Sequence, residues 1–193
     1  MHRRQFFALP AALATASLAE PTAAALADEP AARVQPPASR TPVLLVKAGR
    51  DRDNQPFRWL DATFHVKVSG RDNGGRCVIF DTLRAEKVGP PMHLHTDCDE
   101  WFFVREGEFK FQVGQDTMRL GPGDSLLVSQ NTPHAFVKTS DGVARLIVMH
   151  QPAATMEEYF HAVIGLADQS VEGRRVLAER HGMRIVGEPL KAD

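Results

Sequence analysis

The sequence predicts an all-β domain, a sandwich or barrel of antiparallel strands, followed by two C-terminal helices. Short apolar segments recur between residues 43 and 152, and turns rich in Gly, Asp, Asn and Pro separate them. Short strands at such regular spacing are typical of antiparallel sandwiches and barrels. After residue 152 the apolar residues change to helical spacing, so the all-β part is expected to end there.

The composition fits a single globular domain in a chain of 193 residues, 43% of them hydrophobic. The formal net charge is −1 and the sequence pI is about 6.7. Because no basic stripe runs along the sequence, we expect no nucleic-acid partner.

Residues 1–27 are expected to be a signal peptide that is removed from the mature protein. They begin with an Arg3-Arg4 pair, continue with an uncharged run over residues 6–19, and end in an A-x-A cleavage pattern at residues 25–27. The run is shorter than the about 20 apolar residues that span a bilayer. The Arg-Arg-Gln-Phe-Phe sequence resembles a twin-arginine signal, which predicts a periplasmic or secreted protein with no membrane partner after cleavage. An ordinary secretory signal and a retained anchor are the alternatives.

Residues 28–42 are rich in Ala and Pro and are expected to form a flexible leader. Beyond it we expect a β-barrel over residues 43–152, and helices with a tail over residues 153–193. The first strands of the barrel are predicted at residues 43–46, 63–68 and 76–86, with turns at residues 51–56 and 70–75 between them.

The central strands begin after Pro90-Pro91, which stiffens the entry into the segment from His93 to His95. Further strands are predicted at residues 101–105, 108–113, 117–120, 125–128, 135–138 and 144–150.

The helices are predicted at residues 155–167 and 170–181. In the first, apolar residues recur at spacings of 3, 4, 7 and 8 from Met156, and Thr155 is a natural N-cap. Ser170 caps the second, and Gly182 ends it. A short extended tail follows.

Four side chains form a candidate metal site. His93 and His95 are two residues apart, so a strand would point both to the same face. A polar turn over residues 96–99 would bring in Glu100 at the start of the next strand. His134, which follows a Gly-Pro-Gly-Asp turn and a short apolar strand, is the fourth candidate. Imidazoles and a carboxylate that converge in this way are typical ligands of divalent transition metals.

These two segments resemble the paired motifs of the cupin family. The first motif is His-x-His, three or four residues, Glu, six residues and Gly, and it is matched here by His93, His95, Glu100 and Gly107. The second, Pro-x-Gly, a spacer and His, is matched less closely by the Pro122-Gly123-Asp124 turn and His134. The sequence departs from the pattern at Lys87, where the family has Gly, and at Lys138, where it often has Asn. The resemblance implies a small double-sheet jelly-roll barrel in which the four motif residues bind the metal.

From residue 88 to residue 189 the arrangement, with an EEYF helix and a GEPL tail, looks most like the small quercetinase-like cupins. That resemblance implies a dioxygenase-type oxidoreductase acting on a small enol, phenol or flavonol-like compound. Glu100 would be both ligand and proton acceptor. The cofactor would be one divalent ion, Fe, Mn, Ni, Co or Zn, since the ligand types alone do not select among them. A non-catalytic periplasmic protein that binds a small ligand, and a metal-dependent isomerase or lyase, are the alternatives.

Strand alternation predicts what surrounds this site. If Glu100 points inward, so do Phe102 and Val104, whereas Trp101 and Phe103 point to the other side. Phe136 would point inward with His134. The two outward aromatic residues would suit a homodimer interface, and equally packing against a second sheet.

The remaining histidines and the cysteines are not assigned to the site. His65 and His150 lie on predicted strands and are not expected to be ligands, and His161 and His181 are expected to be exposed. Cys77 and Cys98 could form a disulfide in an oxidising compartment or remain free. A thiol near the metal is a further alternative for Cys98.

Overall fold

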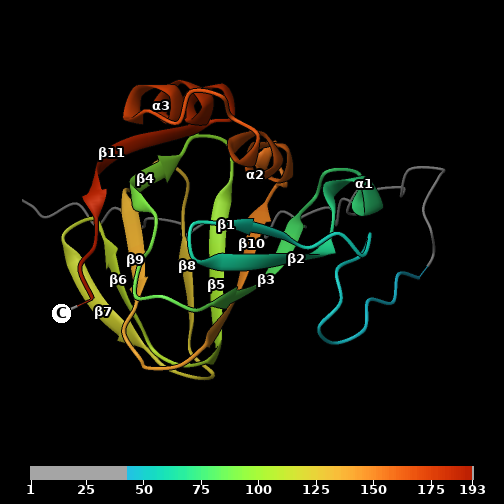
Figure 1. The fold of residues 1–193 in the computed structure, drawn as a ribbon, viewed down its shortest axis with the longest axis horizontal. Helices are drawn as coiled ribbons and strands as arrows, with labels where there is room; N and C mark the ends of the chain where they lie inside the picture. Colours follow the sequence, from blue (N-terminus) through green and yellow to red (C-terminus); the bar gives the residue numbers. More distant parts are fainter. Residues whose placement is uncertain (1–42, 193) are drawn as a thin grey trace, which may run out of the picture. The chain divides into compact units, whose positions relative to one another are not determined.

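A computed structural model describes residues 43–192, and it confirms a mostly β double-sheet jelly roll with C-terminal helices (Figure 1). One sheet has the strand order β1 (Phe57–Trp59), β2 (Ala62–Val68), β3 (Val78–Arg84), β10 (Ala144–Gln151), β5 (Asp99–Glu106) and β8 (Ser125–Val128). The other has the order β11 (Met183–Pro189), β4 (Pro91–His95), β9 (His134–Lys138), β6 (Phe109–Val113) and β7 (Asp116–Leu120). The strand pairs within both sheets are antiparallel.

Strand β5 shows why these segments form a two-layered barrel. Its inward residues Phe102 and Val104 are fully buried, whereas Trp101 and Phe103 on the opposite face are half-buried. This alternation is the one that the sequence predicts, and it fixes the register because a one-residue slip would put the apolar side chains in water. Opposite β5, strand β10 contributes Val148 beside Phe102.

Phenylalanine rings fill the space between the sheets. Phe136 packs 5.4 Å from Phe102 and 5.3 Å from Phe111, measured between ring centroids, and Phe109 lies on its other side at 6.3 Å. Burying one such side chain stabilises the fold by about 1.5–3 kcal/mol. This aromatic group therefore forms the packed part of the barrel, next to the strands that carry the candidate site.

Two helices lie together at one end of the barrel (Figure 1). Helix α2 (Met156–Ile164) buries Met156, Tyr159, Phe160 and Val163, the apolar face that the sequence predicts. Thr155 precedes it as expected, but its side chain makes no capping hydrogen bond. In α3 (Val171–Arg180) the Ser170 hydroxyl accepts the predicted hydrogen bond from the Gly173 amide, at 3.0 Å.

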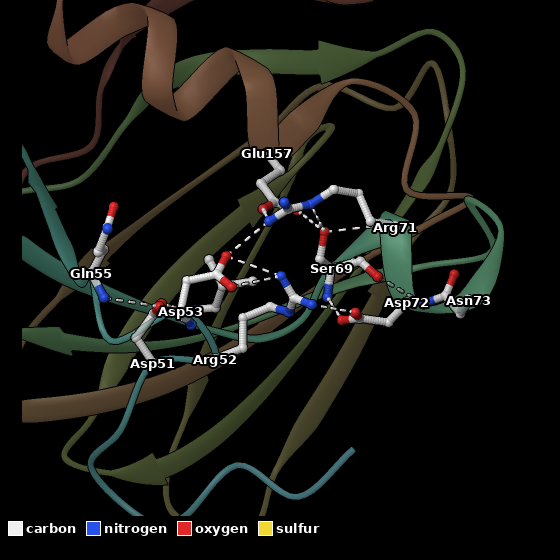
Figure 2. Close-up of polar contacts among 10 residues, drawn as sticks. Asp51, Arg52, Asp53, Gln55, Ser69, Arg71, Asp72, Asn73 and Glu157 are labelled. Carbon is white, nitrogen blue, oxygen red and sulfur yellow. Dashed lines mark hydrogen bonds and ion pairs between the residues drawn. The ribbon is translucent and has the colours of Figure 1, made fainter. Parts of the chain in front are cut away.

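A polar network ties α2 to the β2–β3 connection (Figure 2). Residues 70–75, predicted as a turn, contain one helical turn, α1 (Gly70–Asn73), with Ser69 and Asp72 forming a capping box. The Ser69 hydroxyl also donates to Glu157 in the first turn of α2, at 2.6 Å. Arg71 lies 3.5 Å from the same carboxylate. These contacts hold the start of α2 against the six-stranded sheet.

The structure corrects three predictions about strands. Residues 43–46 form no strand, since Val43 and Leu45 are 77% and 73% exposed and pack against no sheet. Strand β1 was not predicted, because it has only three residues and is stabilised by pairing with β2. The C-terminal tail is extended as expected, but it also pairs with β4, so that Ile185 lies opposite His93.

The predicted signal peptide, residues 1–27, and leader, residues 28–42, lie outside the described residues. Among the helices that are described, none is long and apolar enough to cross a membrane.

Both cysteines are free. Cys98 is 2% exposed and belongs to the apolar core, where burial raises the pKa of its thiol.

Candidate metal centre

The structure brings the four predicted side chains together in a buried cluster. His93 and His95 come from β4, Glu100 from β5 and His134 from β9. Their ligand atoms all lie within 4.8 Å of one another. His93 and His134 are direct partners across the β4–β9 ladder, so the two cupin-like motifs meet at this point.

Local backbone contacts determine how these strands meet. Gly89 lies against the Phe136 carbonyl group of β9 so closely that a Cβ atom at residue 89 would be 1.7 Å from that oxygen. After β4, the backbone amide of Thr96 donates to the Gly182 carbonyl, at 2.8 Å, and its hydroxyl donates to the same oxygen, at 3.0 Å. The turn that leads from His95 to Glu100 is therefore held by the end of α3.

Hydrogen bonds to the backbone orient two of the imidazoles. His93 Nδ1–H donates to the Pro91 carbonyl at 2.8 Å, and His134 Nδ1–H donates to the Thr132 carbonyl at 2.9 Å. Each bond leaves Nε2 as the nitrogen that faces the cluster. Histidine ligands are commonly held in this way, with the other ring nitrogen bonded to a carbonyl group.

One oxygen of Glu100 faces all three imidazoles. Its Oε2 atom lies 2.7 Å from His134 Nε2, 3.1 Å from His95 Nε2 and 4.0 Å from His93 Nε2. Nitrogen lone pairs and a carboxylate oxygen repel one another unless a proton or a cation lies among them. The donor set of three imidazoles and one carboxylate is therefore consistent with a divalent transition-metal site, without indicating which metal.

Electrostatics favour the metal-binding forms of His93, His95 and Glu100, but not of His134. Burial lowers the pKa of His95, and burial together with the charges of His134 and His95 holds the pKa of His93 well below its usual value. Both rings are then neutral near pH 7. Burial alone would raise the pKa of Glu100, but the charge of His150 and hydrogen bonds from neighbouring imidazoles outweigh it, so the net pKa is well below its usual value. For His134, burial would lower the pKa, but the hydrogen bond to Glu100, the charge of Glu100 and the hydrogen bond to Thr132 together outweigh it. The net pKa of His134 is raised, which favours its protonated form when no metal is bound.

His150 is a site residue that the sequence analysis does not assign. It lies on β10 directly opposite Glu100 and is 1% exposed. Its Nε2 atom is 3.2 Å from Glu100 Oε1, the oxygen that faces away from the other imidazoles, although neither ring nitrogen makes a hydrogen bond within residues 43–192. The alternation of β10 already places His150 on the same face as Val148. Its position beside Glu100, however, depends on the β5–β10 register, which the sequence does not reveal.

The other histidines lie outside the cluster. His65 is 9% exposed on β2 and does not line the site cavity. His161 is exposed as predicted, whereas His181 is only partly exposed and its Nδ1 lies 3.0 Å from the Thr155 hydroxyl.

A cavity of about 90 Å³ adjoins the cluster. Its walls are mostly apolar. Phe136 and Phe102 both belong to the packed core, but only Phe136 also lines the cavity. The lining includes Trp59, Phe64, Arg84, His93, Glu100, Phe136, His150, Tyr159, Phe160 and Arg174. Any ligand that reaches the cluster through this cavity would meet aromatic walls and two arginines.

Comparison with known proteins gives one family match and several similar structures. Residues 81–150 match the family described as Cupin domain. KdgF from Halomonas sp. is 16% identical, with a TM-score of 0.47 over 52% of this chain and 87% of that one. The polyketide cyclase RemF from Streptomyces resistomycificus is 22% identical, with a TM-score of 0.42 over 47% of this chain and 65% of that one. A sugar phosphate isomerase from Silicibacter pomeroyi is 19% identical, with a TM-score of 0.42 over 49% of this chain and 61% of that one.

Proposed function

We propose that this protein, in which residues 81–150 match the Cupin domain family, holds one divalent transition metal through His93, His95, Glu100 and His134 and is an oxidoreductase of the dioxygenase type. The observation that carries the proposal is the convergence of three imidazole nitrogens on one buried carboxylate oxygen. In the proposed mature form the protein works in the periplasm, after export by the twin-arginine route.

The two carboxylate oxygens of Glu100 have different neighbours, and this difference suggests a separate role for each. Oε2 faces the three imidazoles and would be the atom that binds the metal, whereas Oε1 lies 3.2 Å from His150 Nε2. When bound, the metal supplies a Lewis acid and, if it is redox-active, a centre for reaction with O₂. Glu100 lines the cavity, and its Oε1 is the atom proposed to accept the proton of a substrate hydroxyl group.

The size of the cavity selects among the proposed substrates. Pockets for drug-sized ligands enclose about 300–1,000 Å³, far more than the about 90 Å³ found beside this cluster. A small enol or a single-ring phenol therefore fits better than a three-ring flavonol.

The first test is the metal content of the full-length protein after expression in a bacterium that exports it. We expect stoichiometric Fe, Mn, Ni, Co or Zn in wild type and a loss of nearly all of it in His93→Ala and His134→Ala. His161→Ala removes an exposed histidine outside the cluster and is the matched control. A wild-type protein without metal, or two ligand variants that keep it, would contradict the assignment.

The second test separates oxidation from the alternatives. O₂ uptake with catechol or a small enol by the metal-loaded protein, and not by the two ligand variants, would support the dioxygenase. Turnover without O₂ uptake would point to an isomerase or lyase. Ligand binding without turnover would point to a binding protein.

A further inference from the structure

Arg84 is a buried cation on the wall of the site cavity, and most of its hydrogen-bonding capacity is unused. It lies at the end of β3 and is 2% exposed. Within residues 43–192 its one hydrogen bond runs from Nη1 to Asp61 Oδ1, at 3.2 Å. Arg84 Nε and Asp61 Oδ2 are both buried without a hydrogen-bond partner among these residues.

Two aromatic rings contact the guanidinium group of Arg84, but they do not accept hydrogen bonds from its N–H groups. Its central carbon lies 4.7 Å from the centroid of the Phe136 ring and 5.9 Å from that of Phe64. Ring faces attract a cation but accept no conventional hydrogen bond. A guanidinium group has five N–H donors, and buried donors without acceptors cost free energy. Burial correspondingly lowers the pKa of Arg84 and raises that of Asp61.

We propose that Arg84 binds the carboxylate group of the substrate, so that the substrate class is a small enol or phenol that carries one carboxylate. This proposal deepens the proposed function, on which it rests: the hydroxyl end of the ligand reaches the metal and Glu100, and the carboxylate end reaches Arg84. Both groups line the same cavity, and the aromatic walls between them suit the body of the ligand.

Charge and shape favour a carboxylate over a phosphate. Among the buried groups, a divalent ion, ionised Glu100 and the Arg84–Asp61 pair would leave the site with one net positive charge, which a monoanion balances. The other cation in the lining, Arg174, is exposed, and water screens its charge. A phosphate group carries about −1.5 to −2 charges near pH 7 and would overcompensate. A carboxylate is also planar and matches the fork of a guanidinium group, which can donate two parallel hydrogen bonds to it.

The competing interpretation is that Arg84 and Asp61 form only a structural ion pair. Replacing both partners of a buried pair by apolar residues usually preserves a fold, whereas removing one leaves an uncompensated charge. The informative variant is therefore Arg84→Met combined with Asp61→Leu. Arg145 and Asp81 form a second ion pair, on the same sheet and outside the cavity lining, so Arg145→Met with Asp81→Leu is the matched control.

A second arginine in the lining requires its own control. Arg174 donates through Nε and Nη2 to the Gln169 carbonyl, at 2.9 and 2.7 Å, so part of its capacity is already used. If Arg174→Gln, and not the Arg84 double variant, abolished recognition of the carboxylate, the assignment to Arg84 would be wrong.

The experiment compares 2-hydroxybenzoate with its neutral amide, 2-hydroxybenzamide, in calorimetric titrations of the full-length protein as purified, without removal of metal. We expect wild type to bind the carboxylate at least about tenfold more tightly, as hydrogen bonds to a charged group imply. The Arg84→Met/Asp61→Leu variant should lose this preference, and the Arg145→Met/Asp81→Leu control should keep it. Circular dichroism and the thermal midpoint establish that each variant is folded.

Two results would overturn the proposal: a wild-type protein with no preference for the carboxylate, or a folded Arg84 double variant that retains it. If the double variant does not fold, Arg84→Lys replaces it. Lysine offers a point charge in place of a fork, so the preference should fall several-fold, and an unchanged preference would contradict the proposal. Metal content of the same samples is measured separately, so a failed metal assignment is distinguishable from a failed carboxylate assignment.

Discussion

At the scale of single residues, His150 determines how Glu100 presents its second oxygen. The imidazole lies 3.2 Å from Oε1, and the side chain is 1% exposed beside Phe80 and Phe160. A neighbour that positions a carboxylate ligand typically changes metal affinity by about 10–100-fold when removed. His150 is thus expected to act through Glu100, as a positioning residue.

The prediction is that His150→Phe lowers metal affinity by about 10–100-fold without abolishing binding, since the four ligands remain. Competition with a chromophoric chelator measures the affinity, and the absorption spectrum of the Co(II)-loaded protein reports any change in ligand geometry. His150→Gln, which restores a polar partner for Oε1, should recover part of the loss. His65→Gln, outside the cavity, is the control. An unchanged affinity and spectrum in His150→Phe would show that the residue only fills space.

The candidate ligands could be predicted from sequence, whereas His150 and Arg84 could not. His93 and His95 share a face of one strand by alternation, turns in the sequence place Glu100 and His134 as candidates near them, and the cupin resemblance groups all four as metal ligands. The position of His150 depends on the register between β10 and β5, which pairs it with Glu100, a residue far from it in the chain. Local sequence patterns do not determine such pairings, because the energy that fixes them comes from packing between the sheets.

At the scale of the elements, the close approach of the segment before β4 to β9 determines whether the two motifs meet. Gly89 provides that approach, because a Cβ atom there would lie 1.7 Å from the Phe136 carbonyl oxygen and 2.9 Å from its carbon. Both are backbone atoms, so a rotamer change cannot relieve the clash. Only a glycine therefore fits at residue 89. The structure gives the physical reason for it.

We expect Gly89→Ala to lower the free energy of unfolding by roughly 1–3 kcal/mol or more, because β4 and β9 must separate to admit the methyl group. The same separation should weaken metal binding, since His93 and His134 are partners across these strands. Urea unfolding and metal titration measure the two effects. Gly121→Ala is the matched control, because nothing lies within 4 Å of a Cβ atom there. Equal stability of the two variants would contradict this role for Gly89.

The elements themselves were predicted well where apolar and polar residues alternate or follow helical spacing. Strand β8 and the buried face of α2 were predicted as observed. The predictions were wrong or incomplete where contacts between distant segments decide whether a segment joins a sheet. Residues 43–46 are apolar but meet no sheet, and β11 looks like an extended tail in the sequence but pairs with β4.

At the scale of the whole barrel, the candidate metal centre joins the two sheets. His93, His95 and His134 belong to the five-stranded sheet, and Glu100 belongs to the six-stranded one. A metal held by all four would therefore link the sheets at one point, beside a cavity where they are not packed together. The aromatic group around Phe136 links them elsewhere, so the barrel does not depend on the metal alone to fold.

Metal removal is consequently expected to lower thermal stability while leaving the protein folded. A ligand that binds only the native state stabilises it by about 2.7 kcal/mol when its concentration is a hundredfold above Kd. For a chain of this size, that corresponds to a fall in Tm of about 5–10 °C when a chelator removes the metal. Differential scanning calorimetry with and without chelator measures the shift, and His134→Ala, which lacks a ligand, should show almost none. If wild type and His134→Ala respond equally to the chelator, the metal that stabilises the protein lies elsewhere and does not link the sheets through this cluster.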